Sequence, residues 1–112
     1  MRVLLAEDNV PFRSALVRMI AALGHEVRAV PDGTALIAAA AALQPDLVLS
    51  DVDMPGCDGV LACRALRDAG LAERFVLMSG DPASMERARR AGFGSVLVKP
   101  FPLEDLAAML AP

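Results

Sequence analysis

The stretch that decides the fold is DLVLSDVDMPGCDG, residues 46–59, in which a short apolar run passes directly into a loop with three aspartates. The run DLVLS (46–50) is typical of a strand that is buried on both faces of a sheet. Met54-Pro55-Gly56 predicts a turn, because proline and glycine favour turn conformations. Asp58 precedes Gly59 and a helical run, which is the usual place of a helix N-cap. The segment therefore predicts a strand, an acidic loop and a helix.

Strand-like and helix-like segments alternate along the rest of the chain. The first predicted helix has apolar residues at helical spacing and stops at Gly24. Such alternation produces βα units with right-handed crossovers, and hence an α/β fold in which helices cover both faces of a parallel sheet. The predicted strands are 2–6, 26–30, 46–50, 75–78 and 95–98, and the predicted helices are 10–23, 33–43, 58–69, 82–91 and 103–110.

Length, charge and hydropathy limit the classes of function. A chain of 112 residues corresponds to one domain, 1–112. Its net charge of −3 argues against a nucleic-acid partner, which would need a basic surface. The longest apolar run, 35–43, is too short to cross a bilayer, and the start of the chain lacks the features of a signal peptide. We expect a cytoplasmic protein with no membrane partner.

The cysteines and the single histidine do not form a recognisable site. Cys57 and Cys63 lack the Cys-x-x-Cys spacing and the partner histidine of a zinc or redox site, so we interpret them as reduced cysteines. His25 follows Gly24 and is interpreted as a turn residue. These positions exclude a catalytic triad that depends on histidine.

Functional side chains gather at the predicted strand ends. Ligands of open parallel sheets bind at the carboxyl ends of the strands, where the strand order reverses. If the strand order is 2-1-3-4-5, the first and third strands lie about 4.8 Å apart and their acids meet. The residues that follow the strands are Glu7 and Asp8, Asp51, Ser79, and Lys99.

The acidic residues predict a divalent cation. Glu7, Asp8 and Asp51 contribute −3 and Lys99 contributes +1, so a balance of −2 remains. Oxygen ligands without histidine or cysteine favour a hard ion, and Mg²⁺ that keeps waters and a phosphate oxygen fits best. The cluster therefore predicts chemistry on a phosphoryl group.

Each of these residues also has a purely structural interpretation. Asp8 or Asn9 could cap the first helix, Ser79 could cap the fourth, and Lys99 could be a surface lysine along the sheet edge. The joint placement disfavours these interpretations, since four strand ends carry an acid pair, an acid, a hydroxyl and an amine.

This joint pattern resembles the receiver domain of bacterial response regulators, the CheY-like family of two-component signalling, over essentially the whole chain. The resemblance rests on AEDN (6–9), LVLSDVDMPGCDG (47–59), VLMSG (76–80) and LVKPF (97–101). It implies a flavodoxin-like (βα)5 fold with strand order 2-1-3-4-5. It also implies a signalling module rather than an enzyme, one that catalyses only its own phosphorylation and dephosphorylation.

The resemblance assigns roles to the residues of the site. Asp51 accepts the phosphoryl group, Ser79 is the switch hydroxyl, and Lys99 pairs with the phosphoryl oxygens. The implied Mg²⁺ ligands are Asp8, Asp51, Glu7 through water, and the backbone carbonyl of Asp53, whose side chain is expected at the mouth of the pocket. The Lys99-Pro100 bond is expected to be cis.

The resemblance also implies partners. The phosphodonor is a histidine kinase or a histidine phosphotransfer protein, and we expect the chain to be a monomer. The first helix carries more apolar side chains than one buried face requires, among them Val10 and Phe12, so we expect it to dock the donor.

In the family a Tyr or Phe usually stands three residues before the lysine and swings inward. Here that residue is Val96, which is stiff and small, so the read-out on the face of helix 4, strand 5 and helix 5 is expected to weaken.

Two alternatives remain open at this point. DVDMP also resembles the Asp-x-Asp signature of haloacid dehalogenase-type phosphatases, with Asp51 and Asp53 as its acids. That signature belongs on the first strand and needs acids after the lysine, whereas 50 residues precede Asp51. The other alternative is a degenerate receiver that binds without phosphorylation. The sequence is expected to be either a stand-alone receiver, which Met1 before the first strand favours, or part of a larger kinase.

Overall fold

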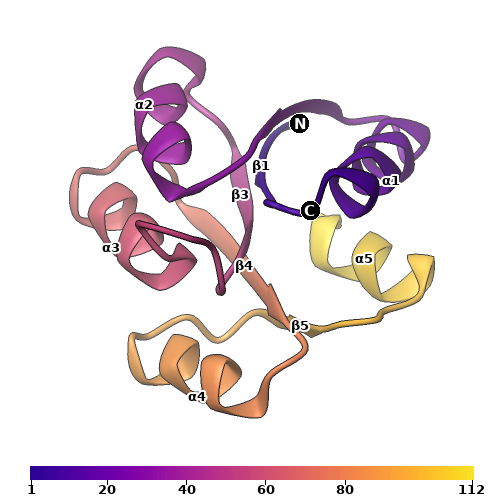
Figure 1. The fold of residues 1–112 in the computed structure, drawn as a ribbon. Coiled ribbons are helices and arrows are strands. Elements are labelled where there is room, and N and C mark those ends of the chain that lie inside the picture. The colour runs from indigo at the N-terminus through magenta and orange to yellow at the C-terminus, as the bar shows by residue number, and fades with distance from the viewer.

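A five-stranded parallel sheet forms the centre of the computed structural model, which covers residues 1–112, and its strand order is β2-β1-β3-β4-β5 (Figure 1). The predicted α/β fold and strand order are therefore confirmed. The strands are β1 (Arg2–Ala6), β2 (Glu26–Val30), β3 (Leu47–Asp51), β4 (Arg74–Ser79) and β5 (Val96–Val98). The helices are α1 (Val10–Ala22), α2 (Gly33–Leu43), α3 (Gly59–Asp68), α4 (Pro82–Arg90) and α5 (Leu103–Leu110).

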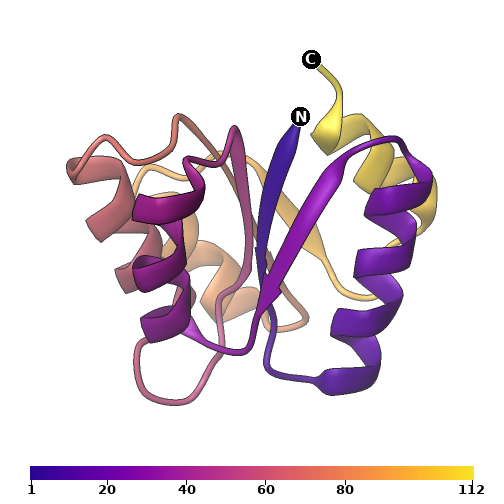
Figure 2. The ribbon, with the colours of Figure 1, turned by 90° about the horizontal axis from the view of Figure 1, so that it is seen from above.

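Helices cover both faces of the sheet. Figures 1 and 2 show α1 and α5 on one face and α2, α3 and α4 on the other. Alternate residues of each strand supply the two cores, as the period of two requires. In β1, Val3 and Leu5 pack toward α1 and α5, whereas Leu4 packs into the core on the α2 to α4 side. None of the helices has the length and apolar character of a bilayer span.

No element boundary differs from the prediction by more than one residue. The expected helix ends Leu23, Asp58, Ala69 and Ala91 are cap residues that lie just outside α1, α3 and α4. β3 runs from 47 to 51 instead of 46 to 50. Asp46 precedes the ladder, where its carboxylate accepts a hydrogen bond from the Arg2 backbone N–H at 2.7 Å.

The bounds of β4 and β5 also differ from the prediction, because backbone pairing and not apolar character determines where a strand ends. β4 extends from the predicted 75–78 to Arg74–Ser79, since Arg74 is in register with Leu47 and Ser79 with Val98. β5 is shorter than the predicted 95–98 and comprises only Val96–Val98.

The surroundings of Cys57, Cys63 and His25 agree with their interpretation as reduced cysteines and a turn residue. Cys57 and Cys63 are both free, and burial raises the pKa of the Cys63 thiol to about 12, which keeps it protonated in the core. His25 lies in the turn after α1, with its Nδ1 3.2 Å from the N-terminal nitrogen of Met1. Gly24 adopts a φ of 91°, which explains why the helix stops there.

The N-terminus of α3 packs directly against the end of β3. The Gly59 backbone N–H donates a hydrogen bond to the Val52 carbonyl at 2.9 Å. A Cβ on Gly59 would collide with the carbonyl oxygen of Asp51 and would lie 2.9 Å from Ser50 Oγ. Because the collision is with backbone, no flexible side chain can give way. The absence of a side chain at Gly59 therefore sets how closely α3 approaches Asp51.

We predict that Gly59→Ala lowers the free energy of unfolding by about 1–3 kcal/mol, the usual cost of overpacking. Denaturant unfolding measures the change. Gly94→Ala is the matched control, because a Cβ there meets nothing within 4 Å and Gly94 is not among the glycines with positive φ. Equal losses in the two variants would contradict the close approach of α3 to Asp51.

Candidate phosphorylation and metal site

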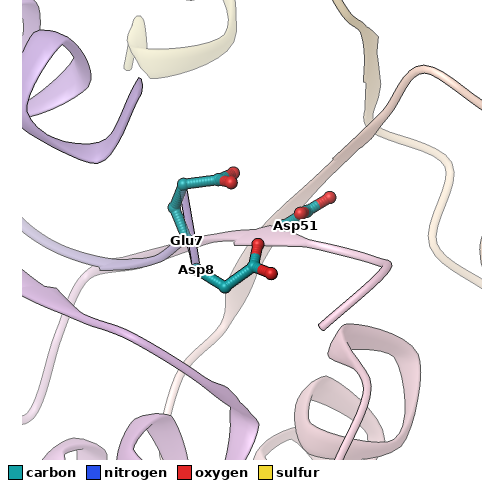
Figure 3. A group of neighbouring side chains, drawn as sticks. All are labelled: Glu7, Asp8 and Asp51. Atoms are coloured by element: carbon teal, nitrogen blue, oxygen red, sulfur yellow. The ribbon is translucent and has the colours of Figure 1, made fainter. Parts of the chain in front are cut away.

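Three carboxylates meet at the carboxyl edge of the sheet, as the strand order predicts. Glu7 and Asp8 follow β1 and Asp51 ends β3, and Figure 3 shows the three side chains next to one another. One oxygen of each carboxylate lies within 4.8 Å of the other two. Glu7 and Asp51 are buried, whereas Asp8 is exposed. This acidic group consists only of oxygen ligands, which is the donor set that Mg²⁺ prefers.

Lys99 joins the two buried carboxylates. Its Nζ lies 2.9 Å from Glu7 Oε2 and 3.3 Å from Asp51 Oδ2. The ammonium also lies 4.8 Å from the centroid of the Phe12 ring, within the range of a cation–π contact. The Lys99-Pro100 bond is cis, as expected. Lys99 is therefore part of the site and not a surface lysine along the sheet edge.

Phe12, which was expected to lie in an apolar docking surface of the first helix, also contacts the site. Its ring is partly buried and packs edge-on against Phe101, with ring centroids 5.9 Å apart, and the Lys99 ammonium lies over it. Aromatic rings pack more favourably against each other and a cation than against water. Phe12 thus supports the pocket, and Val10, which is 57% exposed, remains at the surface of the helix.

Burial makes the Asp51 carboxyl harder to ionise. Desolvation, and after it the charge of Glu7, raise the pKa of Asp51 from 3.8 to about 6, against the opposing effect of Lys99. An anionic Asp51 is therefore destabilised in the absence of further positive charge. A cation that offsets this negative charge therefore fits the site.

Ser79 bonds a carboxylate that lies outside the acidic group. Its Oγ donates to Asp53 Oδ2 at 2.9 Å and accepts from the Asp81 backbone N–H at 3.0 Å. The Asp53 side chain is 50% exposed, and its backbone N–H faces Asp51 Oδ1 at 3.4 Å. The structure thus places the Asp53 backbone beside Asp51 and the Asp53 carboxylate beside Ser79.

The N-caps of α1 and α4 are side chains other than Asp8 and Ser79. Asn9 caps α1, since its Oδ1 accepts from the Phe12 backbone N–H at 2.9 Å. Asp81 caps α4 through the Ala83 backbone N–H at 3.0 Å. The alternative that Asp8 or Asn9 caps the first helix is thus confirmed for Asn9, whereas the capping interpretations of Asp8 and Ser79 were wrong. The predicted cap at Asp58 is confirmed by its bond to the Leu61 backbone N–H at 2.9 Å.

Two residues of α4 were not identified from the sequence. Ser84 is buried and its Oγ donates to Asp53 Oδ1 at 2.7 Å. Arg87 forms ion pairs with Asp53 at 3.6 Å and with Asp58 at 3.0 Å. The sequence did indicate that Ser84 and Arg87 share one face of the helix, because they are three residues apart. This spacing could not reveal their contact with Asp53, because it does not show which loop the face contacts.

Comparisons with known proteins agree on one family. The family model of the response regulator receiver domain matches residues 3–111. The chain is 39% identical over 107 residues to the transcriptional regulatory protein PdtaR of Mycobacterium tuberculosis, covering 94% of this chain and 52% of that protein. It is 30% identical over 108 residues to the DNA-binding response regulator MtrA of the same species, covering 96% of this chain and 47% of that protein. The chain therefore spans about half the length of these relatives.

Solved structures show the same fold over nearly the full length of the chain. The chemotaxis protein CheY4 of Vibrio cholerae superposes with a TM-score of 0.88 at 26% identity, covering 97% of this chain and 94% of that one. The receiver domain of the sensor histidine kinase PA1611 of Pseudomonas aeruginosa superposes with a TM-score of 0.87 at 28% identity, covering 97% and 93%. That structure contains a magnesium ion coordinated in its active-site cleft.

The chain belongs to the response regulator receiver domain family, and it is a signalling module of the two-component type. The phosphatase alternative finds no support in these comparisons. Glu104 and Asp105 also lie in the first turn of α5, where they cannot supply the strand-end acids that the phosphatase needs.

We predict that Asp51→Asn stabilises the fold in metal-free buffer in a pH-dependent way. Because the folded pKa of about 6 exceeds 3.8, ionisation of Asp51 opposes folding. This penalty is absent below pH 3.8, grows between 3.8 and 6, and is complete above that window, where it reaches at most about 3 kcal/mol. Asparagine carries no such penalty.

Denaturant unfolding with a chelator present, at about pH 8 and about pH 4, measures the difference between Asp51→Asn and the parent chain. The variant is expected to be more stable at the higher pH, with the gain largely lost at the lower pH. A gain of the same size at both pH values would contradict a raised pKa for Asp51.

Proposed function

We propose that Asp51 is the phosphoacceptor of a two-component phosphorelay, and that the chain acts as a phosphorylation-dependent switch or as a phosphate relay. The observation that carries this proposal is the position of the buried Asp51 carboxylate, in contact with the Lys99 ammonium and next to the carboxylates of Glu7 and Asp8. Family membership supports it as well.

The proposed reaction is transfer from a phosphohistidine of the donor. An oxygen of the Asp51 carboxylate forms a bond to phosphorus while the phosphorus–nitrogen bond breaks. The donor histidine carries a proton on its other ring nitrogen, so it takes the electron pair of the broken bond and leaves as neutral imidazole. Such a transfer depends on positioning and charge stabilisation more than on further covalent chemistry. Lys99, whose Nζ is 3.3 Å from Asp51 Oδ2, is placed to neutralise the oxygens of the new acyl phosphate.

The acidic group fits Mg²⁺. One oxygen of each of the three carboxylates lies within 4.8 Å of the other two, so they offer hard ligands. Three carboxylates beside one lysine leave negative charge that a divalent cation would offset. Glu7, Asp8 and Asp51, with the backbone carbonyl of Asp53, would hold the ion. When bound, it would supply positive charge to the phosphoryl oxygens.

Ser79 is proposed as the switch hydroxyl that closes on the phosphoryl group. It ends β4 on the neighbouring strand to Asp51, it is buried, and its hydroxyl can rotate. Val96 lies on β5 in register with Leu77 and packs against the core on the α2 to α4 side. Because Val96 is small and stiff, we propose that the closure of Ser79 is transmitted through the loop after β4 and not through an aromatic side chain.

Asp51→Asn is expected to abolish phosphorylation by acetyl phosphate. Intact mass spectrometry measures the transfer as a gain of about 80 Da, the mass of one phosphoryl group. Asp58→Asn is the control, since asparagine is an equally good helix cap and Asp58 lies outside the acidic group. A parent chain that gains no mass would support the degenerate receiver. Turnover of a phosphomonoester would support the phosphatase.

The donor is proposed to be a histidine kinase or a histidine phosphotransfer protein that docks on α1. Val10→Glu is expected to slow transfer from the donor at least about fivefold without changing phosphorylation by acetyl phosphate, because an acid is favourable in the first helical turn and leaves the pocket intact. Leu61→Glu in α3 is the matched control, since Leu61 is 56% exposed, as against 57% for Val10, and lies on the opposite face of the sheet. Equal slowing by both variants would contradict docking on α1.

A further inference from the structure

The Ser79 hydroxyl has a single proton, and in this structure that proton is donated to Asp53. The Ser79 Oγ to Asp53 Oδ2 distance is 2.9 Å. A serine hydroxyl donates one hydrogen bond at a time. If Ser79 is to donate to a phosphoryl oxygen on Asp51, its bond to Asp53 has to break. The Asp53 carboxylate and the phosphoryl group are therefore competing acceptors for one proton.

The Asp53 carboxylate is fixed in its competing position by α4. Ser84 Oγ donates to the other carboxylate oxygen, Asp53 Oδ1, at 2.7 Å, and Arg87 Nη2 lies 3.6 Å from the same oxygen. These two contacts leave Oδ2 turned toward Ser79. Half of the Asp53 side chain is exposed, so without them the carboxylate could turn into water at little cost.

Ser84 is the stronger of the two contacts. It is buried, 3% exposed, and a short hydrogen bond from a buried hydroxyl to a carboxylate is directional. Arg87 is 49% exposed and shares its guanidinium with Asp58 at 3.0 Å, so solvent weakens its hold on Asp53. Asp81 Oδ2, 3.3 Å from Ser84 Oγ, is a longer alternative acceptor for the same proton, so the 2.7 Å bond to Asp53 is the favoured one.

We infer that Ser84 is a positioning residue that sets how readily Ser79 leaves Asp53 for the phosphoryl group, with Arg87 in a lesser role. The inference rests on the proposed roles of Asp51 and Ser79. Ser84 touches neither Asp51 nor a phosphoryl group, and acts by orienting Asp53. The bond between Ser84 and Asp53 therefore favours the unphosphorylated arrangement of Ser79.

The test is the affinity of the full chain for beryllofluoride, the phosphoryl mimic, in the presence of Mg²⁺. Ser84→Ala is expected to bind the mimic about two- to fivefold more tightly, within the range of coupling between residues of one hydrogen-bond network. Arg87→Gln is expected to act in the same direction and less strongly. Arg89→Gln, an exposed position on the same helix without a contact to Asp53, is the matched control and is expected to bind like the parent chain.

A double-mutant cycle separates positioning from a general effect on the fold. In a Ser79→Ala background the competition is absent, so adding Ser84→Ala is expected to leave the affinity unchanged. The Asp81 amide gives a second measurement, since it loses its bond to Ser79 Oγ when Ser79 moves. Its chemical shift is expected to move further toward the beryllofluoride-bound position in Ser84→Ala than in the parent chain at the same subsaturating mimic concentration.

The outcomes distinguish this inference from the function on which it rests. If the parent chain binds beryllofluoride and Ser84→Ala binds it with equal or lower affinity, the positioning role is wrong and the proposed function stands. An equal gain with and without Ser79 would also overturn the positioning role. If the parent chain neither binds beryllofluoride nor is phosphorylated by acetyl phosphate, the proposed function itself fails.

Discussion

The contact of the Lys99 ammonium with the Glu7 and Asp51 carboxylates is the interaction on which the site depends. The parallel pairing of β1 and β3 brings these two carboxylates to one edge, and both are almost fully buried. Two buried like charges are unfavourable unless a cation lies between them, and burial still raises the pKa of Asp51 to about 6. Lys99 compensates part of this charge, so the site is stable enough to form and still retains an excess of negative charge. That remaining negative charge is what a bound metal ion can offset.

Close packing and hydrogen bonds hold the backbone around Asp51. Gly59 brings the first turn of α3 against the backbone of Asp51, and Ser50 Oγ donates to the Asp51 carbonyl at 2.9 Å. Asn9 caps α1, which leaves the Asp8 side chain uncommitted at the edge of the pocket. The side chains that stabilise the helix ends are thus different from those that form the site. This separation allows the acidic group to keep its unfavourable charge without weakening the helices around it.

The fold and most of the site could be predicted from the sequence because both follow from local patterns. Apolar runs that alternate with helical stretches define a parallel sheet, and the carboxyl edge of such a sheet collects the residues that follow each strand. Glu7, Asp51 and Lys99 were found in this way. The contacts of Ser84 with Asp53 and of Phe12 with Phe101 were not predicted, because both depend on how a helix is rotated about its own axis. A pattern of three or four residues identifies a buried face but not the loop or the ring that it contacts.

The hydrogen bond from Ser79 to Asp53 connects the switch hydroxyl to α4 and α3. Asp53 accepts from Ser79 and Ser84, and Arg87 connects the same carboxylate to Asp58, the cap of α3. When Ser79 turns toward a phosphoryl group, the Asp53 carboxylate loses the hydrogen bond from Ser79. Its remaining contacts are those with Ser84, Arg87 and the solvent. On the proposed role of Ser79, and because this chain has no aromatic side chain at position 96, the change would reach α4 through Ser84 and Arg87 and α3 through Asp58. Consequently the surface between α3 and α4, rather than the face of β5 and α5, is the part of the molecule where the two states should differ most.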